Sequence, residues 1–387
     1  MKVAMSIAGR GATIYLVQQL FKRGYLSKLI TSYPKFEIKK YGIPPDLVDS
    51  IVIKEVIERG WRKLPGFIRN VYNPSFLVQE IFDKSAAKRL EPSDIIWIWT
   101  ASALHTIRRA RELGIKTVVE VGNAHPIYQE KILTEEYEKN GQVFRDKNQP
   151  KLLEKMLNEY DETDYISVPS SYVRQTFIEA GVPKKKIIQI PYGADLSEFK
   201  QFPKEDDVFR VVFAGGMTIR KGVHYLLQAF SELNLPNSEL LLIGAMNDEI
   251  KPFFKKYEGH FKYAGFLPKN QLSRSYSQGS VFALDSLDDG FGIVIMQAMA
   301  CGLPLICSTN TGAPDVIEDG KEGFIIPIRN LEALKNKLLF LYKNQKLCRE
   351  MGQAAKQRVA SGFTWDHYGD RIVEEFKRIL RTQGVQS

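Results

Sequence analysis

One short stretch combines a carboxylate, glycines and an apolar helical run in a way that suits the binding of a sugar or phosphate. Segment 286–292 (SLDDGFG) follows a predicted buried strand and precedes a predicted helix. Gly290 and Gly292 let backbone N–H groups converge on a ligand, because glycine carries no side chain. Gln297 lies eight positions after Asp289, just over two helical turns, so both side chains can line one side. A carboxylate can accept hydrogen bonds from sugar hydroxyls and an amide can bond a ribose diol; the alternative is that Asp289 only caps the helix.

A second glycine-rich loop carries two cations. Ala214–Gly222 (AGGMTIRKG) follows a buried strand and opens a helix, and Gly215 and Gly216 let the backbone approach a ligand. A helix N-terminus offers unpaired N–H groups and a partial positive charge, to which Arg220 and Lys221 add two full charges. The helix dipole disfavours basic residues at this end unless an anion compensates. The pattern therefore favours a diphosphate site over the alternative, a surface turn capped by two basic residues.

Two further features carry weaker signals. His125 lies in Glu120–Pro126 (EVGNAHP), after a predicted strand, so we expect a polar contact with substrate at the edge of a cleft. Gly11, in Gly9–Ala12, lies between the first strand and the first helix, where a glycine can admit a ligand phosphate. The full G-x-G-x-x-G fingerprint is missing from this loop, so conventional NAD binding is not predicted.

These loops need a scaffold, and the hydrophobic pattern predicts one. Strand-like runs alternate with helical patterns from residue 3 to residue 190, and the alternation restarts at 208 after a polar stretch. This rhythm predicts an α/β protein with two parallel sheets covered by helices, and a domain boundary at about 192–207. An amphipathic helix is expected over 364–382. Ligands of open α/β sheets bind beyond the carboxyl ends of the strands, so two facing edges would hold two substrates.

Composition narrows the class of protein. The chain has 387 residues and a formal net charge of +9, with 16 Lys/Arg against 9 Asp/Glu in residues 1–100. This bias suggests an anionic ligand or membrane surface, with a solvated face as the alternative. Its apolar residues Phe21, Tyr25, Leu26, Trp61, Leu64, Phe67 and Ile68 are interleaved with Lys22, Arg23, Lys28, Arg62, Lys63 and Arg69. No nucleic-acid-binding motif is present, so nucleic acid is not an expected partner. Three cysteines without C-x-x-C spacing argue against a disulfide framework or zinc site and favour the cytoplasm.

The order of these motifs resembles the retaining GT-B glycosyltransferases of the family four group. The resemblance covers segment 167–199 (SVPSSYVRQTFIEAGVPKKKIIQIPYGADLSEF), the AGGMTIRKG loop, segment 263–276 (YAGFLPKNQLSRSY), the stretch from 286 to 327 and the terminal FTW helix. It implies two Rossmann-like domains facing a central cleft. Residues 1–195 would form the acceptor-side domain and 205–363 the nucleotide-sugar donor domain, with a helix over 364–387 packing back on the first.

The resemblance also implies roles for single residues. His125 would lie near the reacting sugar and Asp289 would face the donor sugar, as the catalytic pair. Lys221 and Arg220 would bind the diphosphate. Gly215 and Gly216 of the AGGMTIRKG loop, and Gly11 of the first loop, would lie beside it. The remaining donor contacts would come from Gly290, Phe291, Gly292, Gln297, Phe266 and Leu267, the last two near the base. Three positions depart from the family pattern: Asp289 and Gln297 replace a pair of glutamates, and Gly216 replaces an arginine.

The predicted function is transfer of a sugar from a nucleoside diphospho-sugar to a hydroxyl of a glycan or lipid-linked acceptor, with retention of configuration. We expect neither a metal ion nor a cofactor besides the donor, because the cations and a helix end can stabilise the leaving diphosphate. The expected location is the cytoplasm, including the inner face of the membrane. The alternatives are a non-catalytic nucleotide-sugar or lipid-headgroup binder, and an epimerase or phosphorylase of the same architecture.

Overall fold

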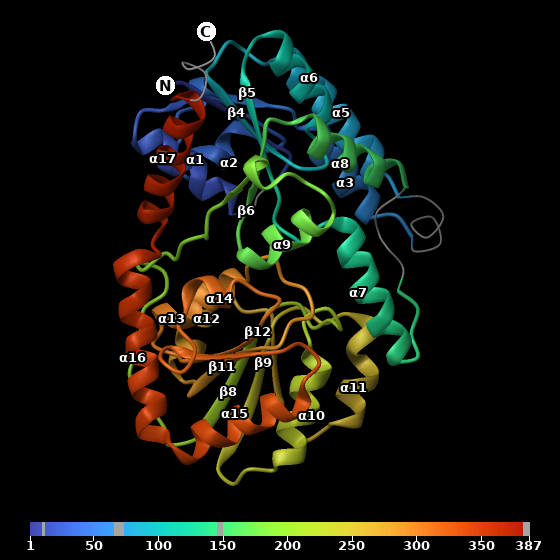
Figure 1. The fold of residues 1–387 in the computed structure, drawn as a ribbon. Helices are drawn as coiled ribbons and strands as arrows, with labels where there is room; N and C mark the ends of the chain where they lie inside the picture. The colour runs from blue at the N-terminus through green and yellow to red at the C-terminus, as the bar shows by residue number, and fades with distance from the viewer. Residues whose placement is uncertain (10–11, 66–72, 145–149, 382–387) are drawn as a thin grey trace.

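The computed structural model describes residues 1–9, 12–65, 73–144 and 150–381. Two lobes lie one above the other, each built on a parallel sheet with helices packed around it (Figure 1). The predicted α/β class with two parallel sheets is confirmed.

The N-terminal lobe contains a seven-stranded sheet in the order β3-β2-β1-β4-β5-β6-β7, and all its neighbouring strands are parallel. Its strands are β1 (Val3–Ile7), β2 (Leu26–Thr31), β3 (Val48–Ser50), β4 (Ile95–Trp99), β5 (Lys116–Glu120), β6 (Tyr165–Val168) and β7 (Ile187–Gln189). Strand β1 is buried at all five residues, as expected of a central strand covered on both faces. The carboxyl ends of these strands therefore meet along one edge.

Helices cover this sheet in the described part of the lobe. They are α1 (Thr13–Lys22), α2 (Lys35–Lys39), η1 (Pro45–Leu47), α3 (Ile53–Arg62), α5 (Ser75–Lys88), α6 (Leu104–Glu112), α7 (Pro126–Lys139), α8 (Pro150–Glu162), α9 (Ser171–Glu179) and η2 (Lys184–Lys186). Helix α7 extends from the upper lobe down to the side of the lower one (Figure 1).

The C-terminal lobe contains a six-stranded parallel sheet in the order β10-β9-β8-β11-β12-β13. Its strands are β8 (Phe209–Ala214), β9 (Ser238–Ile243), β10 (Lys262–Gly265), β11 (Val281–Leu284), β12 (Leu305–Ser308) and β13 (Gly323–Ile326). Its helices are α10 (Val223–Leu233), η3 (Asp248–Ile250), α11 (Lys251–Lys256), α12 (Lys269–Ser277), α13 (Ile293–Ala300), α14 (Ala313–Val316), α15 (Leu331–Lys343) and α16 (Gln345–Gly362).

The chain crosses between the lobes at two adjacent places. The Ala194 N–H donates to the Phe363 carbonyl at 2.8 Å, and the Trp365 N–H donates to the Ala194 carbonyl at 3.3 Å. Helix α17 (Trp365–Arg381) then runs along α1 of the N-terminal lobe (Figure 1). Trp365 stacks on Tyr15 with ring centroids 4.1 Å apart. The last helix thus ties the end of the described chain to the first lobe.

No helix in the described ranges is long and apolar enough to cross a membrane. The three cysteines, Cys301, Cys307 and Cys348, are free and buried.

Candidate active site

A pocket of about 310 Å³ lies between the lobes, at the carboxyl ends of both sheets. The N-terminal lobe contributes Ala12, Trp99, Gly122 and Asn123, and Tyr192 comes from the segment after β7. The C-terminal lobe contributes Ala214, Gly215, Lys221, Asp289, Phe291, Gly292, Ile293 and Val294. The structure therefore brings five residues of the predicted donor site, from two loops, to one pocket.

The loop after β8 places its glycines for different reasons. Gly222 has φ +68° and begins α10, and a Cβ on it would lie 1.7 Å from the Asp285 carbonyl oxygen. Glycine is therefore required there, both by the left-handed backbone and by the close approach. Gly215 has φ +152°, and its N–H donates to the Ile243 carbonyl at 2.9 Å. The Gly215 amide is thus used in the sheet, and the positive end of α10 and Lys221 remain to attract an anion. Gly216 is half-buried in the same loop.

Lys221 and Asp289 form a salt bridge at this pocket, with both side chains largely buried. Burial alone would raise the pKa of the Asp289 carboxyl, but the charges of Lys221 and Arg220 outweigh it and lower that pKa. The carboxylate also accepts the N–H of Phe291. It does not cap α13, because Gly292 occupies the N-cap position with φ +75°. Asp289 is therefore a charged group held against the lysine, and the capping alternative is wrong.

Arg220 is held on segment 286–292, here called the acidic loop. Its Nη1 donates to the Asp288 main-chain oxygen at 2.7 Å, and its own carbonyl accepts the Leu287 N–H at 2.9 Å. The Arg220 guanidinium is 3.6 Å from the Asp288 carboxylate and does not line the pocket itself. It acts on the pocket through its charge.

Gly290 is explained by contact between the lobes. A Cβ on Gly290 would lie 1.8 Å from the Gly122 carbonyl oxygen, so only glycine lets the two backbones pass. The Gly290 carbonyl accepts the Ser170 hydroxyl at 2.5 Å. Next to it, the Phe291 ring packs edge-on against Tyr192, with centroids 5.3 Å apart. The acidic loop is therefore docked directly on the N-terminal lobe.

Three of the other predicted site residues, Gln297, Phe266 and Leu267, lie outside the pocket lining. Gln297 is half-buried on α13, and its Oε1 accepts the Tyr276 hydroxyl at 3.4 Å. Phe266 and Leu267 follow β10; the Phe266 side chain is 80% exposed and Leu267 is half-buried. Gly11 lies outside the described residues.

The structure does not bring the His125 ring to the pocket. His125 is the N-cap residue of α7 and is buried, and its ring packs edge-on against Phe177, with centroids 5.0 Å apart. The main-chain N–H of His125 donates to the Thr176 hydroxyl at 3.0 Å. Burial lowers the pKa of this histidine to about 4, so the ring is neutral at pH 7. The neighbouring Asn123 lines the pocket instead.

A buried carboxyl group supports the N-terminal wall of the pocket. Glu120 accepts bonds from the Trp97 indole at 2.7 Å, the Thr13 hydroxyl at 2.8 Å and the Tyr192 hydroxyl at 3.0 Å. Tyr192 lines the pocket, so Glu120 fixes one of its walls. Sequence reasoning missed Trp99, Asn123 and Tyr192. The available signal was their place in the chain: Trp99 lies at the carboxyl end of a predicted strand, and Asn123 and Tyr192 follow predicted strands.

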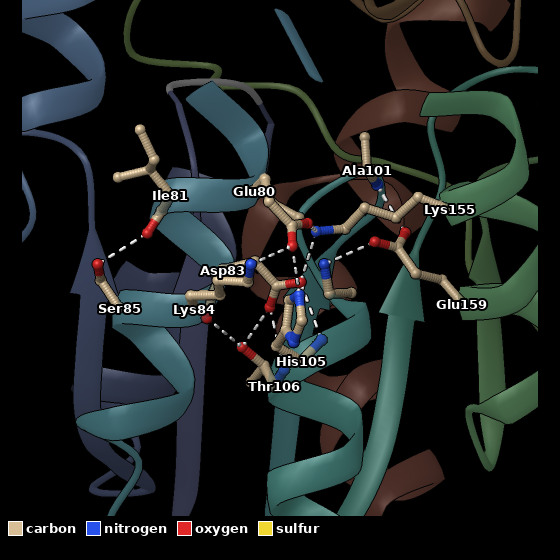
Figure 2. A network of polar contacts seen from close by, with 12 residues as sticks. Glu80, Ile81, Asp83, Lys84, Ser85, Ala101, His105, Thr106, Lys155 and Glu159 are labelled. Atoms are coloured by element: carbon tan, nitrogen blue, oxygen red, sulfur yellow. Dashed lines mark hydrogen bonds and ion pairs between the residues drawn. The ribbon is translucent and has the colours of Figure 1, made fainter. Parts of the chain in front are cut away.

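A second group of charged residues lies in the N-terminal lobe (Figure 2). Asp83 accepts the N–H groups of His105 and Thr106 at 2.9 and 3.0 Å, and Glu159 accepts those of Ala101 and Ala103, both at 2.7 Å. These carboxylates thereby accept hydrogen bonds from the N–H groups at the start of α6, which have no partner within the helix.

Lys155 belongs to the same group, and its ammonium nitrogen lies 2.7 Å from the Asp83 carboxylate and 2.9 Å from the Glu80 carboxylate (Figure 2). The group therefore has a structural role. Within the described residues, no set of three or more His, Cys, Asp and Glu side chains is arranged to hold a metal ion.

Comparison with known proteins agrees with this geometry. A family described as "Glycosyl transferases group 1" matches residues 195–358, which include the AGGMTIRKG loop and the acidic loop. A GDP-mannose-dependent alpha-(1-6)-phosphatidylinositol monomannoside mannosyltransferase of Mycolicibacterium smegmatis is 24% identical over 242 residues, 55% of this chain and 62% of that protein. O-antigen chain mannosyltransferase B of Escherichia coli is 27% identical over 174 residues, 43% of this chain and 45% of that protein. The chain thus spans less than two thirds of the length of these curated relatives.

Solved structures extend the similarity to the whole fold. Anabaena Alr3699/HepE in complex with UDP has a TM-score of 0.72 at 17% identity and covers 98% of this chain and 100% of its own. Sucrose-phosphate synthase from Thermosynechococcus elongatus has a TM-score of 0.73 at 17% identity, covering 99% of this chain and 100% of its own. The chain therefore has the GT-B fold, and residues 195–358 match the group 1 glycosyl transferase family.

Proposed function

We propose that this protein transfers a sugar from a nucleoside diphospho-sugar to a hydroxyl group of a glycan or lipid-linked acceptor, with retention of configuration. The observation that carries the proposal is the position of Lys221. Its ammonium group lies in the pocket between the lobes, at the start of α10, beside the acidic loop. A cation and a helix N-terminus together attract a diphosphate, as the order of the loops in the sequence also predicts.

The difficult step in such a reaction is cleavage of the bond between the anomeric carbon and the diphosphate oxygen. Negative charge grows on the departing phosphate, while the sugar becomes oxocarbenium-like. Lys221, the charge of Arg220 and the N-terminus of α10 stabilise that phosphate. Because these groups supply the positive charge, the proposal requires neither a metal ion nor a cofactor besides the donor.

With retention, the acceptor hydroxyl approaches on the face from which the phosphate leaves. The departing phosphate oxygen then takes the proton of the acceptor hydroxyl as the new bond forms. Asp289, negatively charged in the pocket, faces the developing positive charge of the sugar ring. We propose that His125 acts by fixing the start of α7, next to the Asn123 side chain that lines the pocket.

A donor screen tests the proposal. The purified protein is titrated with UDP, GDP, ADP and TDP, and the corresponding sugar donors, including GDP-mannose and UDP-glucose, are then assayed for turnover with and without added acceptor. We expect binding of one nucleoside diphosphate and acceptor-dependent release of it from the donor. Binding without turnover would favour the alternative, a non-catalytic nucleotide-sugar binder, in which Asp289 and Gln297 replace the family's glutamates. No binding at millimolar concentration would overturn the proposal.

We further propose that the protein works at an anionic membrane surface on the cytoplasmic side. On α2 and α3, Phe36, Ile53 and Val56 are 66%, 49% and 65% exposed. The segment before α2 contacts the first turn of α3, because the Ser32 hydroxyl donates to Glu55 at 2.8 Å.

The basic side chains of Lys35, Lys39 and Arg59 are exposed on the same helices, and that of Lys40 is exposed just after α2. Apolar side chains among cations are typical of a surface that binds anionic lipid. Leu26, which the sequence grouped with this surface, is buried in β2 and does not contribute.

Vesicle flotation at low salt tests the membrane proposal. Vesicles with anionic lipid should retain the wild-type protein, and Phe36→Ser/Val56→Ser should weaken this retention. Equal recovery with neutral and anionic vesicles would contradict it.

A further inference from the structure

Asp288 is a fully buried carboxylate on the acidic loop whose oxygens are bonded by the other lobe. The Tyr172 hydroxyl, on α9, donates to Oδ1 at 2.8 Å. The Gln129 side-chain amide, on α7, donates to Oδ2. Both donors are neutral, and both come from the N-terminal lobe. The pKa of the Tyr172 hydroxyl is raised by burial and by the Asp288 charge, so it stays a donor at neutral pH.

Arg220 competes for the same carboxylate. Its guanidinium is 3.6 Å from Asp288 Oδ2, and its hydrogen bond goes to the Asp288 main-chain oxygen at 2.7 Å. A buried carboxylate without its neutral donors would turn to the nearest cation, because an unsatisfied buried charge costs several kcal/mol. The bonds across the lobes therefore keep Arg220 from being fully neutralised.

The charge of Arg220 matters at the pocket. It is next to Lys221 in the chain, and it acts with Lys221 to lower the pKa of the Asp289 carboxyl. A diphosphate that binds at Lys221 would feel this same charge. Neither Tyr172 nor Gln129 lines the pocket, so any effect they have on ligand affinity must pass through Asp288.

From these contacts we propose that Asp288 is a positioning residue that links docking of the two lobes to diphosphate affinity. When the lobes are docked, Tyr172 and Gln129 satisfy Asp288, and Arg220 keeps its positive charge for the ligand. When they separate, Asp288 pairs with Arg220 and weakens the diphosphate site. This inference rests on the proposed function, because it assumes that a nucleoside diphosphate binds at Lys221.

The test measures binding of a nucleoside diphosphate to the full chain by calorimetry, using whichever of UDP, GDP, ADP and TDP binds the wild-type protein. Tyr172→Phe/Gln129→Leu removes both neutral donors and should weaken binding by about 5- to 50-fold. Adding Asp288→Asn to that variant should restore most of the affinity, because an amide cannot neutralise Arg220. Asp288→Asn does not restore the hydrogen bonds between the lobes. Recovery of the affinity would therefore show that the loss came from charge competition at Arg220 and not from undocking of the lobes. Each single variant, Tyr172→Phe or Gln129→Leu, should give part of the loss, which keeps the test usable if the double variant does not fold.

Gln189→Leu is the matched control. Gln189 donates at 2.8 Å to Asp315, a second carboxylate bonded by the N-terminal lobe, and no cation is among the partners described for Asp315. This variant should bind the nucleoside diphosphate as wild type does. Unchanged affinity in Tyr172→Phe/Gln129→Leu, or no recovery with Asp288→Asn, would overturn the inference and leave the proposed function intact. A wild-type protein that binds none of UDP, GDP, ADP and TDP would overturn both.

Discussion

The Lys221 ammonium is paired with the Asp289 carboxylate inside the pocket between the lobes, although the two residues come from different loops. A ligand phosphate would share this lysine with a resident carboxylate. The site therefore holds its cation in place before the ligand arrives, which reduces the reorganisation needed on binding.

Replacement of Lys221 by alanine tests its role in the reaction. Lys221→Ala should lower kcat/KM for the best donor by about 100- to 1000-fold, because a fixed charge on the leaving phosphate is lost. Steady-state kinetics and circular dichroism would measure activity and folding. Lys251→Ala, at an exposed lysine of α11, is the control and should change neither. Wild-type kcat/KM in Lys221→Ala would show that the phosphate lies elsewhere.

Replacement of Gly290 tests the close contact of the lobes. Gly290→Ala would place a Cβ 1.8 Å from the Gly122 carbonyl oxygen, so one backbone must move. We expect a loss of about 1–3 kcal/mol in unfolding free energy, together with lower activity, because Asp289 is the adjacent residue. Urea denaturation measures the first effect and turnover the second. A Cβ on Gly362 would meet nothing within 4 Å, so Gly362→Ala should leave both near wild type. A fully active and stable Gly290→Ala would contradict the described docking.

Lys155 should be important for stability and not for chemistry. Its side chain is 3% exposed, and Lys155→Met would leave the fully buried Asp83 carboxylate without its cation. The expected loss is about 3–5 kcal/mol, measured by urea unfolding, with faster hydrogen exchange at the start of α6. Lys84 also pairs with Glu80, but it is 57% exposed, so Lys84→Met should cost under about 0.5 kcal/mol. Equal effects of the two substitutions would contradict this assignment.

The buried carboxyl group of Asp285 should make the stability of the protein depend on pH. It is buried, neither carboxyl oxygen has a hydrogen-bond partner among the described residues, and burial, with the charge of Glu136, raises its pKa from 3.8 to about 7. The folded-state pKa exceeds the unfolded one, so this group's stabilisation is complete below pH 3.8 and is lost as pH rises through 7.

Asp285→Asn removes this titration. Its unfolding free energy relative to wild type should therefore rise by roughly 2–4 kcal/mol between pH 4 and pH 8. Denaturant titrations at a series of pH values measure this difference. A flat profile for Asp285→Asn would show that the group is charged in the folded protein at all of these pH values.

Local pattern predicted much of the fold. The described elements follow the predicted alternation of strands and helices, because apolar residues recur along most elements and glycines punctuate the loops between them. Strands β2, β3 and β13 have weaker signals in the sequence. Segment LSKLIT of β2 mixes polar and apolar residues, β3 is a three-residue edge strand, and β13 begins with a glycine at φ +157°.

The sequence by itself determined that two α/β units follow one another and that glycine-rich loops with cations and carboxylates lie at their strand ends. These features depend on neighbours within a few positions, so they can be seen in the chain. Only the tertiary structure decided that Lys221 meets Asp289, that Gly290 is needed to pass Gly122, and that the His125 ring packs on Phe177 and away from the pocket. Such contacts join residues about 50 or more positions apart, and they are set by how the sheets and helices pack, which no local pattern records.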